Sequence, residues 1–292
     1  MTEKEKFHKK ISFGLGLDKN NIISSFCNLS IPNFLRNKDL KITMNSLSSG
    51  ELKLTDPKNE LKVFKNENKI LNQSFNILGI SYKKVFNNSS LEYSVQRENN
   101  DSMQREMNDE NIIYKISYKN SYINFVNGIK NNLNAFTKAV ISFRKEFTYK
   151  NMFVDCKYSL GQIMGNAPLT ERFFLGEEIK GYKKNSIYPS NIDGRTFVQL
   201  SNKIGIIFRD IKCFTFSDLG FCSKEKSIVN AINTLSSCTI NRCYPSNMAM
   251  SVGLGISSHV KMIDKNISAF VAFPLTENNC EGKIQVGIEA DF

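Results

Sequence analysis

The chain has 292 residues and a formal net charge of +11, from 39 Lys and Arg against 28 Asp and Glu. Hydrophobic residues make up 41% of it, which is too many for a wholly disordered chain, and the length allows one large domain or two ordinary ones. The basic excess alone fits nucleic acid, an anionic membrane surface or acidic partners. The N-terminus has no apolar core of the kind found in secretory signals, and no stretch approaches the ~18 apolar residues of a membrane-spanning helix.

The residue types that usually carry catalysis or bind metals are scattered. The seven cysteines form no CxxC pair and no zinc spacing, and an odd count without a signal peptide indicates free thiols in a reducing compartment. His8 and His259 are isolated, and no phosphate-binding glycine loop occurs. The sequence therefore predicts no enzyme, no cofactor and no metal site.

In chain order, the expected elements are β-strands, because apolar and polar residues alternate with a period of two. The clearest alternating stretches are 11–17, 40–45, 112–118, 251–257 and 284–292. Helical periodicity is weak and confined to 227–235, so no helix is predicted there. Strands with one apolar and one polar face fit a soluble sandwich or small barrel, or a membrane barrel whose apolar face meets lipid.

Three features favour the membrane barrel. The polar faces carry charge and glycine together, the last strand ends in an aromatic residue, and roughly sixteen strands of about ten residues would use ~160 positions. Two long connections complete this prediction of a single barrel over 1–292. The first, 87–111, is polar and is predicted to be a solvated insertion, whereas the second, 166–196, holds aromatic and glycine residues typical of a packed, functional loop.

The second connection carries a motif. ERFFLGEEIKGY at 171–182 resembles the RFFLGG…RG(F/Y) hallmark of the BamA-type outer-membrane barrel insertases (the bacterial surface antigen superfamily). FSDLG at 216–220, SVGLGI at 251–256 and AFVAFPL at 269–275 are similar to that family's later strands, in the same order. The superfamily includes the barrel subunit of the mitochondrial sorting and assembly machinery and a protein-conducting channel of the plastid outer envelope. The resemblance covers 171–292 and implies a transmembrane antiparallel β-barrel whose sixth loop folds into the lumen.

The resemblance implies two groups of loop-site residues. The loop motif is Phe174, Leu175, Gly176, Ile179, Lys180, Gly181 and Tyr182, and its anchor on the barrel wall is Asp218 with Phe216 and Gly220. The family's arginine is replaced by Lys180, which keeps the charge and loses the two-pronged guanidinium. The anchor is therefore expected to be weaker, or to depend more on Glu177, Glu178 and Tyr182. Without the flanking motifs, Lys180 would be interpreted as a solvated turn residue.

The last strand has a second recognisable pattern. Residues 285–292 fit the β-signal of mitochondrial outer-membrane barrels: polar, any, glycine, two of any kind, hydrophobic, any, hydrophobic. A barrel closes by pairing its first and last strands, and a weak seam would let an incoming strand pair there by β-augmentation. Gly287 is expected to weaken this seam by removing a side chain and kinking the strand. The closing-strand and lateral-gate residues are Gln285, Gly287, Ala290 and Phe292.

The resulting prediction is a membrane insertase of the mitochondrial outer membrane that opens between 11–17 and 285–292. Its expected partners are β-barrel precursors, accessory subunits of an assembly complex and the lipid bilayer, and not nucleic acid. Because alternation begins near residue 11, no N-terminal soluble receptor domain is expected. The alternatives are a passive anion-selective porin, a plastid envelope translocation channel of the same superfamily, and a soluble basic all-β binding protein.

Overall fold

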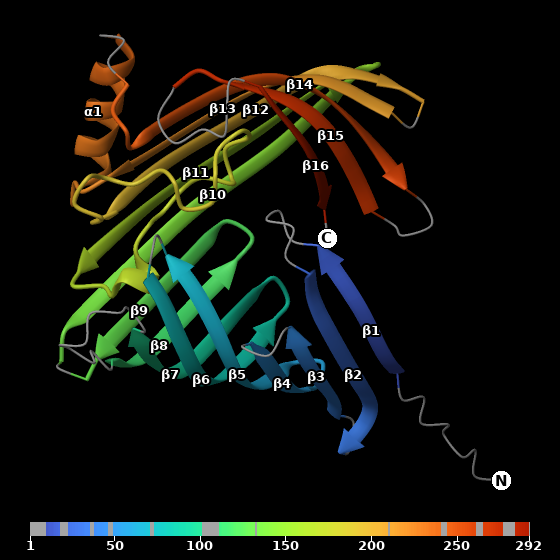
Figure 1. The fold of residues 1–292 in the computed structure, drawn as a ribbon, viewed down its shortest axis with the longest axis vertical. Helices are drawn as coiled ribbons and strands as arrows, with labels where there is room; N and C mark the ends of the chain where they lie inside the picture. Colours follow the sequence, from blue (N-terminus) through green and yellow to red (C-terminus); the bar gives the residue numbers. More distant parts are fainter. Residues whose placement is uncertain are drawn as a thin grey trace. The chain divides into compact units, whose positions relative to one another are not determined.

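Antiparallel strands in a single sheet make up most of the computed structural model (Figure 1). It describes residues 10–17, 23–35, 38–45, 49–70, 73–100, 111–131, 133–209, 211–240, 244–260, 265–276 and 284–291. Within these ranges sixteen strands follow one another in chain order, each hydrogen-bonded to its sequence neighbours. The predicted fold class, an all-β antiparallel barrel-type sheet of about sixteen strands, is confirmed at this level.

The chain divides into two compact units, residues 1–137 and 138–292, and β10 crosses the boundary. The first unit holds β1 (Lys10–Leu17), β2 (Ile23–Leu35), β3 (Lys38–Asn45), β4 (Gly50–Thr55), β5 (Asn59–Ile70), β6 (Gln73–Phe86), β7 (Ser89–Asn100), β8 (Asn111–Asn120) and β9 (Ile123–Lys130). The second holds β10 (Ala135–Tyr149), β11 (Met152–Gly165), β12 (Thr196–Phe208), β13 (Ile211–Ser223), β14 (Met248–Val260), β15 (Lys265–Pro274) and β16 (Gln285–Asp291), with the 3₁₀ turn η1 (Leu169–Glu171) and helix α1 (Ile228–Ile240).

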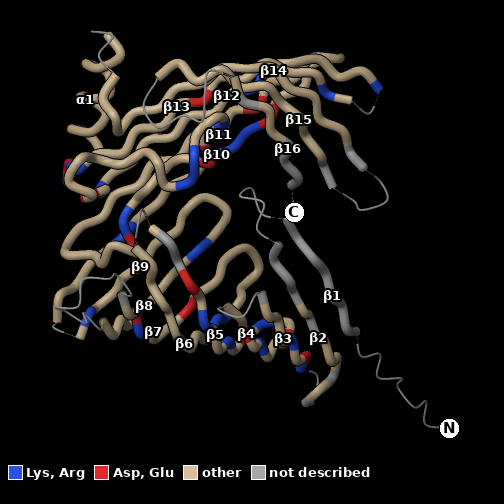
Figure 2. Tube along the Cα trace, in the orientation of Figure 1, with Lys and Arg blue, Asp and Glu red and all other residues tan. Residues whose placement is uncertain are grey.

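Side chains in the first unit alternate between an apolar exposed face and a polar face, as a period of two requires. In β6, Leu78 and Ile80 are 54% and 56% exposed, while Ile77 and Ser81 on the other face are buried. The polar face carries ion pairs: the ammonium of Lys62 lies 2.7 Å from the Glu51 carboxylate across β4 and β5. Figure 2 shows such charges along the strands and not only at the turns.

The second unit has the same two-faced construction. Ile204 and Leu254 stand on its apolar face and are 52% and 58% exposed. The opposite face bears Phe153, Phe214, Phe216 and Phe270, whose rings form one buried cluster. We call it the loop face, because the 166–195 connection packs against it.

Two sequence predictions are wrong. Ser89–Asn100, expected as part of a solvated insertion over 87–111, forms strand β7, and only 101–110 of that stretch lie outside the described residues. Its polar residues can be buried because they hydrogen-bond one another on the polar face: the Gln96 amide donates to Glu98 on the same strand, and both side chains are buried.

The second error is α1, where no helix was predicted. The helix lies against the apolar face of the sheet, where Ala231 and Leu235 pack on Val198, Phe221 and Met248. It contains no charged residue and is wholly tan in Figure 2. Among the described residues, no helix is both long and apolar enough to cross a membrane.

Candidate functional site

The connection between β11 and β12 leaves the strand after Gly165 and returns at Thr196, so it matches the predicted loop to within one residue. Figure 1 shows it in yellow, running back over the sheet. Its two ends are joined by Asp193, whose carboxylate accepts from Arg172 Nη1 at 2.7 Å and from Arg195 Nε at 2.8 Å. Leu175 and Ile187 exchange backbone hydrogen bonds, which folds the middle of the loop into a hairpin-like arrangement. These contacts fix the backbone that presents the motif.

Lys180 and Asp218 meet on the loop face, as the resemblance predicted. Lys180 Nζ lies 3.4 Å from Asp218 Oδ2, and the Lys180 backbone N–H donates to the same oxygen at 3.3 Å. The Ser201 hydroxyl donates to Asp218 Oδ1 at 2.6 Å from the neighbouring strand β12. The Asp218 side chain is fully buried and that of Lys180 is 8% exposed. A carboxylate removed from water in this way needs such partners, since desolvation of an unpaired charge costs several kcal/mol.

Aromatic rings complete the surroundings of the lysine. Its ammonium lies 5.1 Å from the ring centre of Phe216 and 5.6 Å from that of Phe270. The two rings meet edge to face, with centroids 5.9 Å apart. Strand register explains the grouping, because Phe216 is two residues from Asp218 on the same face of β13, and Phe270 is on β15. Lys180 is therefore held by one carboxylate and two aromatic rings.

Gly220 lets the loop approach the sheet closely. A Cβ at this position would lie 2.8 Å from Cγ1 of Ile179 and 3.3 Å from Cδ1 of Leu175. Ile179 is fully buried and Leu175 is 5% exposed. The glycine of the FSDLG strand thus provides the space that the apolar side of the motif fills.

The end of the motif is fastened to β14 and to the end of β15. The Tyr182 hydroxyl contacts the carbonyl oxygens of Met250 and Thr276 at 2.9 and 3.0 Å and the Thr276 hydroxyl at 2.6 Å. Gly181 has a φ of +94°, a conformation that disfavours any side chain, and a Cβ at this position would lie 2.9 Å from Cγ of Pro274. Tyr182 therefore contributes to the anchor, as expected when Lys180 was compared with the family's arginine.

The remaining motif residues stabilise the loop itself. Phe174 is half-buried, with its ring centre 6.1 Å from that of Tyr188. The Gly176 N–H donates to the Glu178 carboxylate at 3.0 Å, and Glu177 reaches Lys184 at 3.8 Å with both side chains well exposed. The two glutamates are thus engaged within the loop and contribute less directly to the anchor than Tyr182.

The closing strand β16 pairs with β15 in a regular register from Ala272 opposite Gln285 to Asn266 opposite Asp291. Gly287 sits opposite Phe270, whose ring occupies the space that a Cβ would take. The pairing continues through Gly287 without a register shift, and the glycine leaves room for the ring. Ala290 is placed by its backbone pairing alone, and Phe292 lies outside the described residues.

Sequence reasoning missed four contributors: Ser201, Phe270, Thr276 and the Arg172–Asp193 pair. Arg172 stands inside the ERFFLG motif and was available as a signal. Ser201 and Thr276 are single polar residues at the right register, which only strand pairing reveals. Among the described residues, no group of three or more His, Cys, Asp or Glu side chains is placed to hold a metal ion.

Comparison with known proteins finds similarity of structure only: no family model and no curated protein matches the sequence. The chain is similar to the crystal structure of BamA from Haemophilus ducreyi lacking POTRA domains 1–3, with a TM-score of 0.63 and 13% identity over 99% of this chain and 76% of that one. CdiB from Acinetobacter baumannii has a TM-score of 0.48 and 8% identity, covering 97% of this chain and 65% of that one. Wzi, a carbohydrate-binding β-barrel involved in capsule assembly in Escherichia coli, has a TM-score of 0.46 and 9% identity over 95% and 76% of the two chains. The TM-score of 0.63 to BamA shows that the chain has the fold of the BamA β-barrel.

Proposed function

We propose that the chain is an integral outer-membrane β-barrel that inserts other β-barrel proteins into the membrane. The single observation that carries the proposal is the loop motif seated on the sheet, with Lys180 against Asp218. The motif and its anchoring strand were both recognised from their resemblance to the BamA-type insertases, and they meet on a BamA-like fold. No covalent chemistry is part of the proposed mechanism.

The apolar face supports placement in a membrane. Isolated exposed hydrophobic residues are ordinary in soluble proteins, whereas large contiguous apolar patches mark interaction surfaces. Here the exposed positions recur at every second residue of successive strands, for example Ile204 and Ile206 on β12 and Leu254 and Ile256 on β14. This is the pattern that lipid contact requires of a spanning strand.

The finer part of the proposal concerns the gate and the organelle. We propose that a client strand carrying a β-signal pairs with β1 and displaces β16, since an open strand edge in lipid would leave backbone amides unsatisfied. The loop, fixed to β13, β14 and the end of β15, keeps the wall beside β16 in place during this exchange. The β-signal pattern at the C-terminus supports the mitochondrial outer membrane, with accessory assembly subunits as partners.

Depletion of the chain in its own cells, followed by import of a labelled porin precursor, tests the function. Insertase activity predicts that porin assembly falls before the membrane level of other proteins changes. If porin assembly is normal and the purified chain conducts ions, the chain is a passive porin and the proposal is wrong. Quantitative release from membranes by alkaline carbonate would replace it with a soluble β-protein.

The gate has its own test. A photo-crosslinking residue in place of Phe13 in β1 should capture barrel precursors during assembly, and one in place of Val63 in β5 should not. Val63 is a suitable control because it stands on the apolar face of an internal strand and is exposed. Equal capture at both positions would contradict a gate at β1.

A further inference from the structure

Three cations in the second unit lie over aromatic rings on the last residues of β10 and β12 or directly after them. Lys145 Nζ is 4.7 Å from the ring centre of Phe147, Lys150 Nζ is 5.5 Å from that of Tyr149, and the Arg209 guanidinium carbon is 5.5 Å from that of Phe208. We call Lys145, Lys150 and Arg209 the rim cations. The three rings beneath them are between 53% and 73% exposed.

Strand pairing places two of the rim cations, Lys150 and Arg209, near one another. Lys150 is in the turn after β10, and Arg209 follows β12 directly. Strand β11 lies between them: Met152 pairs with Ile206, and the Ile207 N–H donates to the Asn151 carbonyl at 2.6 Å. The ends of β10 and β12 thus present Lys150 and Arg209 at one edge of the sheet, and Lys145 lies farther back on β10, four residues before Tyr149.

Two cations on the loop face of the same unit, Arg144 and Lys212, have carboxylate partners. Lys212 lies 2.5 Å from Glu146, and Arg144 lies 2.9 Å from Asp155. In the described part of the unit, no acidic side chain pairs with Lys145, Lys150 or Arg209. A ring attracts a cation through its face and leaves the N–H groups on the other side available to an anion.

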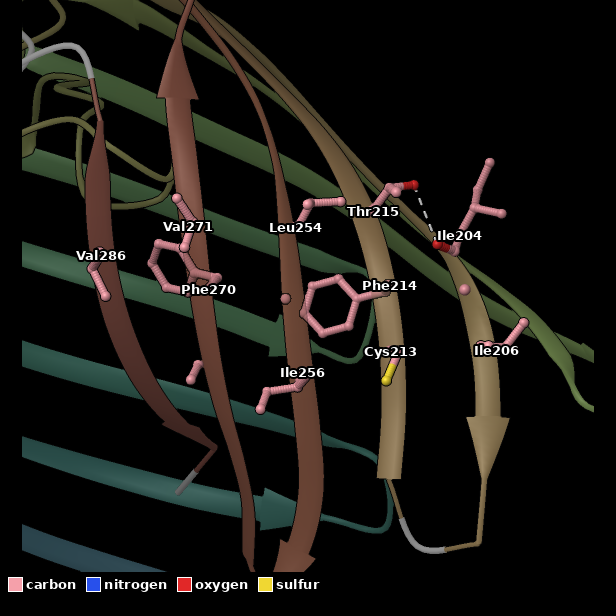
Figure 3. A pocket seen from close by; sticks show the side chains of 13 residues that line it. Ile204, Ile206, Cys213, Phe214, Thr215, Leu254, Ile256, Phe270, Val271 and Val286 are labelled. Carbon is pink, nitrogen blue, oxygen red and sulfur yellow. Dashed lines mark hydrogen bonds between the residues drawn. The ribbon is translucent and has the colours of Figure 1, made fainter.

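An apolar groove of about 650 Å³ begins beside this rim. It lies on the apolar face, where the small side chains of Cys213 and Thr215 separate ridges of branched ones, as Figure 3 shows. Ile206 lines the groove and is two residues from Phe208 on the same face of β12. The other lining residues include Ile204, Leu254, Ile256, Val271 and Val286.

We propose that the rim cations and this groove together bind an anionic phospholipid, with its phosphate at Lys150 and Arg209 and an acyl chain in the groove. The inference rests on the proposed membrane placement. Aromatic residues concentrate at the headgroup level of membrane proteins, and basic residues there attract anionic lipids. The first unit has a similar pair at the end of β6, where Lys84 lies 5.6 Å from the ring centre of Phe86.

The test uses the full chain folded in zwitterionic detergent micelles and titrated with phosphatidylglycerol or phosphatidylcholine, with retained lipid measured by native mass spectrometry. Phosphatidylglycerol should be retained preferentially. The triple variant K145Q/K150Q/R209Q should bind it roughly a hundredfold more weakly, since a basic residue near a membrane surface contributes roughly fivefold. The control K183Q/K224Q/K226Q removes the same charge from exposed lysines in the long connections and should retain the preference.

A second variant tests the acyl chain. Cys213→Leu fills the groove from its exposed floor without changing charge, and it should lower retention of both lipids. Equal retention of the two lipids would overturn the inference, and so would an equal loss in the control triple variant. Unchanged lipid binding by Cys213→Leu, or complete displacement of the lipid by free inorganic phosphate, would also overturn it. Release of the chain from vesicles by carbonate would instead show that the membrane placement itself has failed.

Discussion

Removal of the Asp218 carboxylate tests how the loop is held. In an Asp218→Ala variant the Lys180 ammonium, 8% exposed, loses the oxygen 3.4 Å away, and its backbone N–H and the Ser201 hydroxyl lose their acceptor. Breaking one partner of a buried ion pair leaves an uncompensated charge and costs about 3–5 kcal/mol of unfolding free energy. We therefore expect a loss of that size, with the loop becoming accessible to protease before the barrel unfolds.

A double-mutant cycle separates the ion pair from general damage. Lys180→Met removes the cation and keeps a flexible apolar side chain against Phe216 and Phe270. Because the double variant leaves no unpaired charge, its loss of stability should be smaller than the sum of the two single losses. Urea unfolding of the chain in detergent micelles, followed by tyrosine fluorescence and by heat-dependent gel mobility, gives the four free energies.

An exposed pair in the same loop provides the control. Glu177 and Lys184 are 3.8 Å apart, with side chains 43% and 69% exposed, so Glu177→Ala should cost no more than about 1 kcal/mol. If Asp218→Ala lowers the free energy of unfolding as little as Glu177→Ala does, the Lys180–Asp218 pair is effectively solvated and the proposed anchor is wrong. A full loss in Asp218→Ala with strictly additive effects in the cycle would also contradict a direct interaction.

Three other predictions concern single positions. Ser201→Ala should lower the free energy of unfolding by about 1.5–3 kcal/mol, because it removes a hydrogen bond to a carboxylate. Ser251→Ala, on the other strand beside Asp218, should leave stability unchanged or raise it, because the buried Ser251 hydroxyl has no hydrogen-bond partner among the described residues. Urea unfolding of the two variants compares them. Gly220→Ala should lower unfolding free energy by about 1–3 kcal/mol because its Cβ would press on Ile179, and Ile179→Val should recover part of the loss. Hydrogen bonds to Asp56, mainly from the backbone N–H two residues on, hold its pKa below the usual value. Its stabilising effect is therefore present above the unfolded pKa of ~3.9 and lost as pH falls through the folded pKa. The unfolding midpoint of Asp56→Asn should accordingly approach that of the native chain at acid pH, and a pH-independent difference would contradict this.

Much of the strand pattern could be predicted because half of each strand is apolar. The alternation at 251–257 became β14, with Leu254 exposed and Gly253 buried. Strand β7 was missed because a polar composition indicates a loop when the interior is assumed to be apolar. Its Gln96 and Glu98 are buried against each other on a polar face, and Tyr93 and Val95 supply the exposed apolar side.

The helix was missed for a different reason. Its packed stripe consists of Ala231 and Leu235, which are buried, and Cys238, which is partly buried, so only one of these three side chains is large. Other hydrophobic residues of the helix, such as Val229 and Ile232, are exposed. Such a short stripe stabilises the helix only because it packs on the apolar face of the sheet, and that face is formed by strands distant in sequence.

Contacts in the candidate site could be predicted where both residues belong to recognisable motifs, and not where strand register alone brings the residues together. The contact between Lys180 and Asp218 followed from two recognisable segments. The contribution of Phe270 did not, because its place beside Lys180 depends on the pairing of β13, β14 and β15. A sequence pattern records which residues alternate, but the partner of each residue is set by registers that local sequence does not specify.

The same register explains how a lysine occupies the position where the resembling family has an arginine. A guanidinium binds a carboxylate through two parallel N–H groups, and an ammonium cannot. At Asp218 the missing donors come from elsewhere: the Lys180 backbone N–H reaches the oxygen that the ammonium contacts, and Ser201 takes the other oxygen at 2.6 Å. The ammonium also lies over the rings of Phe216 and Phe270, which attract a compact cation without requiring hydrogen bonds. The contacts that orient the Lys180–Asp218 pair thus come from the loop backbone and from three strands, where a single arginine could supply them by itself. Phe270 also packs over Gly287, so it connects these contacts to β16, the strand that would move in the proposed exchange.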